Sequence, residues 1–208
     1  NIKKFENAVC SKVCSEFAIS SNSATSSLHL ACKAFDLRKG DLVWTSPNSF
    51  VASANAAVYC GAEVDFVDIN PHTYNLCVKK LEQKLINAKK NNRLPKIIIP
   101  VHFAGQSCDM KEISRLSKIY KFNIIEDASH AIGATYENEM IGNCKYSDIT
   151  VFSFHPVKII TTGEGGVATT NNKKLAKKIN ILRTHGITKD KREMLNDSHG
   201  PWYFEQHE

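Results

Sequence analysis

Residues 96–127 read KIIIPVHFAGQSCDMKEISRLSKIYKFNIIED, so two short apolar runs flank a longer amphipathic stretch. Residues 96–100 and 123–127 are apolar enough to form strands that are buried on both faces. Asp109 is placed to cap a helix over about residues 110–120, where apolar residues recur at the helical period. A strand, a helix and a second strand in this order predict two parallel strands joined by a crossover helix.

The same alternation continues on both sides of this stretch. Further helices are expected at about residues 2–13, 28–34, 50–59, 78–88 and 173–182. Further strands are expected at about residues 17–19, 42–45, 63–67, 149–154 and 166–170. The sequence therefore predicts one α/β domain over residues 1–208, with three layers and a mostly parallel central sheet that helices cover on both faces.

Composition narrows the class of protein. The net charge is +6, but the basic residues are scattered, and their local excess between Lys79 and Lys96 is interpreted as a solvated helix face. No nucleic-acid-binding module is visible, so nucleic acid is not an expected partner. No apolar run reaches eighteen residues, so no membrane span is expected. Seven cysteines without metal-ligand spacing predict a reduced, cytoplasmic protein that lacks a metal site.

Lys158 is the central candidate for chemistry. It lies between the apolar run at residues 149–154 and the glycine-rich run at residues 163–166. Most lysines are surface residues, but glycines that follow one allow the backbone to pass close to a ligand. Asp127 ends another buried strand, where a helix cap or a magnesium ligand is the alternative role. An amine for a Schiff base and an acid for a pyridine nitrogen are the two groups that pyridoxal phosphate (PLP) needs most.

Other residues are candidates for the remaining contacts of that cofactor. Ala24, Thr25 and Ser26 open a helix, whose free N–H groups and hydroxyls suit a phosphate, although an ordinary cap is the alternative. Ser153 offers another hydroxyl, or is a plain strand residue. Phe50 opens the next helix, where its ring is expected to stack on the cofactor or to pack in the core.

Two histidines lie close to these candidates in the sequence. His130 is a candidate for a hydrogen bond to the cofactor phenolate or to Asp127, and a satisfied core histidine is the alternative. His155 precedes Lys158 by three residues and is a candidate for positioning the substrate or the lysine. Ligands of open parallel sheets bind beyond the carboxyl ends of the strands, so we expect these residues to face one crevice.

Several ordered motifs together resemble the DegT/DnrJ/StrS-type sugar aminotransferases, a branch of the fold-type I PLP enzymes. The resembling segments are 22–28 (NSATSSL), 47–56 (PNSFVASANA), 101–106 (VHFAGQ), 126–131 (EDASHA), 152–158 (FSFHPVK), 163–166 (GEGG) and 183–186 (RTHG). The resemblance runs from about residue 4 to the end of the chain. It implies the PLP-binding large domain of that fold.

This resemblance implies a role for each candidate. Lys158 would form the Schiff base with the cofactor and carry protons, and Asp127 would pair with the pyridine nitrogen. The other implied contacts are His130 near the phenolic oxygen, Phe50 against the ring, and Thr25, Ser26 and Ser153 at the phosphate.

The implied reaction is a transamination in cell-surface sugar biosynthesis. Glutamate would give its amino group to the cofactor, which passes it to the C4 ketone of a nucleotide-linked 4-keto-6-deoxy sugar. Residues 186–188 and 200–206 are similar to the branch that aminates UDP-linked N-acetylhexosamines on the pseudaminic acid route. Relatives form homodimers and carry a small C-terminal domain. We therefore expect residues 1–208 to be a large-domain fragment of a protein that is a homodimer.

Two other interpretations remain at this point. One is a catalytically inactive truncated or regulatory protein that keeps the PLP fold. The sequence argues against it, because it retains Lys158, Asp127 and the phosphate segment. The other is a nucleotide-binding doubly wound domain without PLP. That domain needs a Gly-x-Gly-x-x-Gly turn after the first strand or a P-loop, and the sequence contains neither.

Overall fold

The computed structural model describes residues 1–192, 194–196, 200 and 202–207. Pro201, within the C-terminal segment 200–206 considered above, and the last residue, Glu208, lie outside the described residues. In the described part of the chain, each helix is too short or too polar to cross a lipid bilayer.

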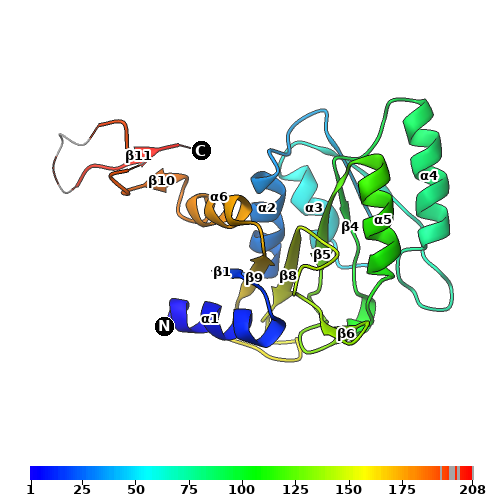
Figure 1. The fold of residues 1–208 in the computed structure, drawn as a ribbon, viewed down its shortest axis with the longest axis horizontal. Helices are drawn as coiled ribbons and strands as arrows, with labels where there is room; N and C mark the ends of the chain where they lie inside the picture. Colours follow the sequence, from blue (N-terminus) through cyan, green and yellow to red (C-terminus); the bar gives the residue numbers. More distant parts are fainter. Residues whose placement is uncertain (193, 197–199, 201, 208) are drawn as a thin grey trace.

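Seven strands within residues 1–192 form one sheet in the order β1-β9-β8-β5-β4-β2-β3 (Figure 1). They are β1 Phe17–Ser21, β2 Leu42–Thr45, β3 Glu63–Phe66, β4 Ile97–Ile99, β5 Asn123–Asp127, β8 Ile149–Ser153 and β9 Gly166–Thr170. The neighbours from β3 to β8 are parallel, whereas β9 is antiparallel to both β8 and β1. A loop without a helix joins β8 to β9, so the chain returns beside β8 in the opposite direction. The prediction of a mostly parallel sheet is confirmed.

Helices cover both faces of this sheet. They are α1 Ile2–Val13, α2 Ala24–Ala34, α3 Ala52–Val58, α4 Val78–Lys90, α5 Met110–Tyr120 and α6 Lys173–Arg183. Figure 1 shows α4 and α5 on the side of the sheet away from α2 and α3. Strand β4 explains this arrangement, because Ile97 and Ile99 join the core cluster of Leu28 from α2, while Ile98 joins the cluster of Leu81 from α4. The predicted three layers are therefore confirmed.

Some elements differ from the prediction. Helix α3 begins at Ala52 and its cap makes no side-chain hydrogen bond, so Phe50 precedes this helix instead of opening it. The strand pair β6 Thr135–Tyr136 and β7 Glu139–Met140 was not predicted. Its turn places Glu137 and Asn138 at positive φ without a glycine, so the usual sequence signal for such a turn is missing.

An arm follows α6. Strands β10 Ile187–Thr188 and β11 Glu205–Gln206 pair antiparallel, and Figure 1 shows them well away from the main sheet. Neither strand was predicted, because two residues carry no readable alternation of polar and apolar side chains.

Candidate active site

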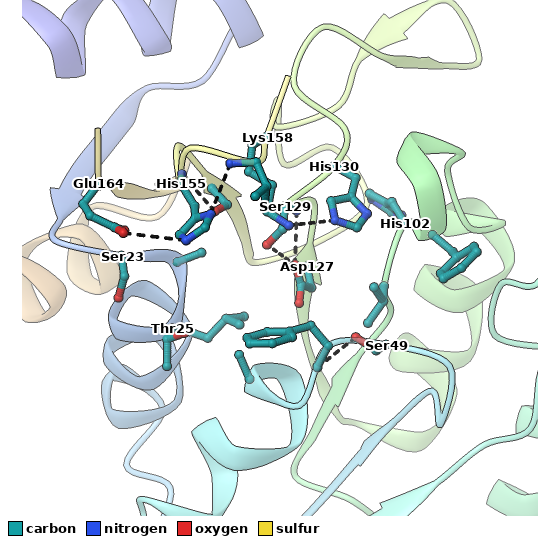
Figure 2. A pocket seen from close by; sticks show the side chains of 18 residues that line it. Ser23, Thr25, Ser49, His102, Asp127, Ser129, His130, His155, Lys158 and Glu164 are labelled. Carbon is teal, nitrogen blue, oxygen red and sulfur yellow. Dashed lines mark hydrogen bonds and ion pairs between the residues drawn. The ribbon is translucent and has the colours of Figure 1, made fainter. Parts of the chain in front are cut away.

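A cavity of about 560 Å³ lies at the carboxyl ends of β2, β4, β5 and β8 (Figure 2). This volume is within the range of small-molecule sites in proteins. Its lining includes every candidate residue except Ser26, namely Ala24, Thr25, Phe50, Asp127, His130, Ser153, His155 and Lys158. The expectation that several strand ends would face one crevice is therefore confirmed. The cavity is also lined by residues that the sequence did not single out, among them Ser49, His102, Ser129 and Glu164.

The first turn of α2 forms one side of the cavity. Ser23 caps this helix, and its Oγ accepts a hydrogen bond of 3.1 Å from the backbone N–H of Ser26. The Ser26 hydroxyl donates to Asn22 Oδ1 over 2.6 Å, which explains why Ser26 does not line the cavity. Ala24 and Thr25 do line it. The alternative of an ordinary cap is confirmed by Ser23, whereas the contact of this segment with a phosphate stays a prediction.

Gly166, at the start of β9, packs directly on this helix start. A Cβ atom at this glycine would lie 2.3 Å from the carbonyl carbon of Ser23 and 2.4 Å from the backbone nitrogen of Ala24. Main-chain atoms on both sides leave no room for a side chain. A glycine is therefore required here for β9 to lie against α2, and this contact fixes the position of the helix start in the cavity wall.

Asp127 ends β5 and lies almost fully buried at the base of the cavity, with 4% of its surface exposed. Ser53 Oγ donates to its Oδ2 over 2.6 Å. Ser129 donates to Oδ1 twice, from its hydroxyl over 2.6 Å and from its backbone nitrogen over 3.1 Å. The Ser129 contact is a local Asp turn that the spacing signals. Ser53 is 74 residues away in the chain and carried no such signal.

Lys158 and His130 meet inside the cavity. Lys158 Nζ lies 2.7 Å from His130 Nε2, and Figure 2 shows the lysine side chain reaching toward the histidine and Asp127. Burial, and then the charge of Lys158, lower the pKa of His130, while Asp127 opposes the shift. The imidazole is therefore neutral at neutral pH, and its Nε2 lies within hydrogen-bond distance of the lysine amine. This partner of His130 is not one that the sequence suggested.

His155 shapes the loop that carries Lys158. Its Nδ1 accepts a hydrogen bond of 3.2 Å from the backbone N–H of Val157, and its carbonyl accepts one of 2.9 Å from the N–H of Lys158. Its Nε2 lies 3.6 Å from Glu164 Oε1. His155 thus holds both ends of a tight turn, and Glu164 ties that turn to the glycine-rich segment.

His102 belongs to a buried polar network behind the cavity. Its Nε2 lies 2.7 Å from Glu126 Oε2, and its Nδ1 accepts a hydrogen bond of 3.1 Å from the backbone N–H of Cys108. Thr150 and Ser147 also donate to Glu126. Burial opposes ionisation of Glu126, but the hydrogen bonds from these side chains keep its pKa below the ordinary value. The network ties the segment after β4 to β5.

Phe50 lies at the rim of the cavity with 73% of its surface exposed. The alternative that it packs in the core is therefore wrong. A large aromatic ring is costly to leave in water, so this position favours contact with a ligand or with another protein surface.

The lining matches the chemical needs of PLP. The start of α2 presents the helix N–H groups of Ala24 and Thr25, which suit a phosphate. A buried carboxylate with a fixed orientation is available for the pyridine nitrogen, and a primary amine is available for the aldehyde. Lys158 and Asp127 line the same cavity, and both influence the pKa of His130. These residues fit the cofactor that the sequence suggested.

The chain is similar to several known aminotransferases. It is 46% identical over 188 residues to the UDP-4-amino-4,6-dideoxy-N-acetyl-beta-L-altrosamine transaminase of Campylobacter jejuni, a match that covers 90% of this chain and 48% of that protein. Helicobacter pylori PseC, an aminotransferase involved in the biosynthesis of pseudoaminic acid, superimposes with a TM-score of 0.85 at 32% identity, over 100% of this chain and 52% of PseC. NtdA of Bacillus subtilis, solved with the bound cofactor PMP, superimposes with a TM-score of 0.79 at 33% identity. This match covers 89% of this chain and 40% of NtdA.

The chain therefore spans about half the length of these relatives. A family model matches residues 1–201, which is nearly the whole chain. The fold, the cavity and this match agree, and the chain belongs to the DegT/DnrJ/EryC1/StrS aminotransferase family.

Proposed function

We propose that the protein to which this chain belongs moves the amino group of glutamate to the C4 ketone of a nucleotide-linked 4-keto-6-deoxy sugar. The cofactor of its family is pyridoxal phosphate. When bound, this cofactor draws away the electrons released as the Cα–H bond of the amino donor breaks. The observation that carries the proposal is the meeting of Lys158, His130 and Asp127 in one cavity beside a helix start.

Each group of residues has a distinct task in holding the cofactor. The Asp127 carboxylate would hold the pyridine nitrogen, in an orientation that its serine donors maintain. Ala24, Thr25 and Ser153 would hold the phosphate through the helix N–H groups and two hydroxyls. Ser26 joins them only if its hydroxyl leaves Asn22.

Lys158 performs the proton transfers. Its Nζ would take the proton from the Cα atom of the amino donor and later give it back. His155 supports this step indirectly, because its hydrogen bonds hold the turn that presents Lys158. Phe50 covers the cofactor ring from the rim of the cavity.

The substrate class is supported by the relatives. The Campylobacter jejuni protein is named for a UDP-linked 4-amino-4,6-dideoxy sugar, and PseC for a pathway to pseudoaminic acid. We propose the same class for this protein, a UDP-linked 4-keto-6-deoxy N-acetylhexosamine. Glutamate is proposed as the donor on the basis of the family motifs.

A second copy of the protein is the proposed partner. Ile159 and Ile160, beside Lys158, are 66% and 55% exposed, and Phe50 adds to this apolar rim. Apolar side chains gathered at a site entrance favour burial by another subunit. We also propose a cytoplasmic location, because all seven cysteines are free thiols in the structure.

The visible spectrum of the complete purified protein tests the function. We expect a yellow band that borohydride bleaches and glutamate shifts, and amino transfer to one member of a panel of UDP- and dTDP-linked 4-ketosugars. Lys158→Ala should keep the cofactor noncovalently and lose transfer by about 100-fold or more. A protein that stays colourless with added PLP supports the inactive alternative. Transfer at the wild-type rate by Lys158→Ala refutes the role of the lysine.

A further inference from the structure

We propose that His130 is a positioning residue for Lys158. Whenever the lysine is not covalently bound to the cofactor, the imidazole of His130 keeps the lysine amine in place inside the cavity. This inference rests on the proposed function, because it describes how the reactive amine of that function is kept ready. It gives His130 a task separate from a contact with the phenolic oxygen.

The geometry of the amine is the first argument. Lys158 Nζ lies 2.7 Å from His130 Nε2, and no other hydrogen bond of this amine is found among the residues that the structure describes. The carboxylate of Asp127 forms no ion pair with this amine, and its two oxygens accept from Ser53 and Ser129 respectively. The acid and the amine therefore have separate partners, although they line the same cavity.

The chemistry of imidazole is the second argument. A neutral imidazole accepts a hydrogen bond from an ammonium group and, in its other tautomer, donates one to a neutral amine. The amine thus keeps the same neighbour in both of its protonation states. Burial and the charge of Lys158 lower the pKa of His130, so the neutral ring predominates at neutral pH.

The backbone around His130 is the third argument. Gly105 has φ +87°, and a Cβ atom at this position would lie 2.6 Å from the His130 carbonyl oxygen. The backbone nitrogen of His102 also donates to the carbonyl of Asp127 over 3.0 Å. The segment after β4 therefore packs closely on the segment that carries His130, which limits the movement of the imidazole relative to the lysine.

The first test needs no cofactor. In the cofactor-free chain, the imidazole protons of His130 are titrated by NMR in the wild type and in Lys158→Met, which removes the cation. We expect the pKa of His130 to rise toward 6.5 in the variant, because a positive charge in contact with the ring lowers it. The other charged or titratable groups that line this cavity are Asp127, Glu164, His102 and His155, and they are unchanged. An unchanged pKa of His130 would show that the two groups do not meet.

The second test measures the reactivity of the amine. PLP is added to the cofactor-free chain, borohydride converts the product into a stable secondary amine, and the rate of labelling at Lys158 is followed by peptide mass. We expect His130→Leu to be about tenfold slower, the equivalent of about 1.4 kcal/mol. His130→Gln, whose amide also accepts and donates, should stay within about threefold of the wild type. His72→Gln, in an exposed loop, is the control for loss of a histidine.

The pH profile separates positioning from a general structural effect. As the pH falls through the lowered pKa of His130, its protonated ring has no lone pair for the ammonium, so the wild-type rate should fall more steeply than that of His130→Gln. The inference is overturned if His130→Leu is labelled at the wild-type rate. It is also overturned if the labelling rate of His130→Gln falls in acid as steeply as that of the wild type. Absence of labelling in the wild type overturns the proposed function and the inference together, whereas labelling that ignores His130 overturns the inference alone.

Discussion

Asp127 is buried in the cavity wall, and its carboxylate forms no ion pair with any residue that the structure describes. Three hydrogen bonds from Ser53 and Ser129 replace the water that its carboxylate loses. Neutral donors of this kind fix the direction of the oxygens and leave the negative charge available to a ligand. A pyridine nitrogen that carries a proton is a ligand that this carboxylate suits.

Asp127→Asn should weaken the binding of the cofactor. The substitution keeps the shape of the side chain but removes its charge, and a hydrogen bond to a charged group contributes about 1.5–3 kcal/mol. We expect the Kd for PLP, measured by equilibrium dialysis, to rise about 10- to 100-fold. Ser53→Ala removes one of the three donors and should have a smaller effect. An unchanged Kd and transfer rate in Asp127→Asn would count against the contact with the pyridine nitrogen.

At the scale of elements, the contact between β9 and α2 has the strictest steric requirement. Gly166 faces main-chain atoms of Ser23 and Ala24, which have no rotamers to adopt. Gly165, its neighbour, faces the side-chain oxygen of Thr162 at 2.4 Å from a built Cβ. Only the second contact is relieved by a side-chain rotation.

Gly166→Ala should therefore separate β9 from α2. Overpacking in a fitted interior costs about 1–3 kcal/mol, and here the backbone itself must move. We expect a loss of at least that size in the free energy of unfolding, measured in urea, and weaker retention of PLP because the helix start shifts. Gly165→Ala should cost less. Equal losses in the two variants would argue against the special position of Gly166.

A buried ion pair joins three further elements. Glu6 Oε1 of α1 accepts hydrogen bonds from the backbone nitrogen of Ser20 over 3.0 Å, from its hydroxyl over 3.1 Å and from Arg183 Nη1 over 2.7 Å. Ser20 lies in β1 and Arg183 ends α6. Burial opposes ionisation of Glu6, but these hydrogen bonds outweigh it and its pKa lies below the ordinary value of 4.5.

The stabilisation by Glu6 should depend on pH. The unfolded chain takes up the proton at the ordinary value, so the contribution is complete above pH 4.5 and is lost as the pH falls through the lower pKa of the folded chain. We expect Glu6→Gln to lower the free energy of unfolding by about 1–3 kcal/mol at neutral pH, and the difference to shrink in acid. Glu63→Gln, in an exposed pair with Arg93, is the control and should change little. A difference that grows in acid would contradict this account.

At the scale of the whole molecule, the entrance of the cavity is apolar and open. Ile159 and Ile160 follow Lys158 on the same loop and are largely exposed. Burial of an isoleucine side chain contributes about 1.5–3 kcal/mol, so burial of both would contribute substantially to the free energy of association. These two side chains lie beside Lys158, so the apolar surface proposed for association is next to the cavity.

The double variant Ile159→Lys, Ile160→Lys should weaken the proposed dimer of the complete protein. Two charges in an apolar interface cost both the lost burial and the desolvation of the ammonium groups, so we expect the dimer Kd to rise by at least about 100-fold. Sedimentation equilibrium measures the change. Ile86→Lys, on the outer side of α4, is the matched control and should leave the dimer intact. A dimer of unchanged stability would place the interface elsewhere.

Local patterns in the sequence determined the elements and the composition of the site. Helix α5 and strand β5 have the predicted bounds, because an Asp cap, helical periodicity and an apolar run act over a few residues. The cavity-lining candidates Lys158 and Asp127 were identified because glycines and strand ends mark the places where a backbone approaches a ligand. Short strands such as β6 and β10 were not predicted, since two residues are too few to show an alternation of polar and apolar side chains.

Only the tertiary structure decided how these parts meet. The direction of β9, the serine that donates to Asp127 from 74 residues away and the pairing of Lys158 with His130 follow from how the crossovers bring strand ends together. Ser26 turned to Asn22, and Phe50 remained at the rim, for the same reason. A hydrogen bond depends on a distance and an angle between atoms, and for residues far apart in the chain these exist only after the sheet and its helices have packed.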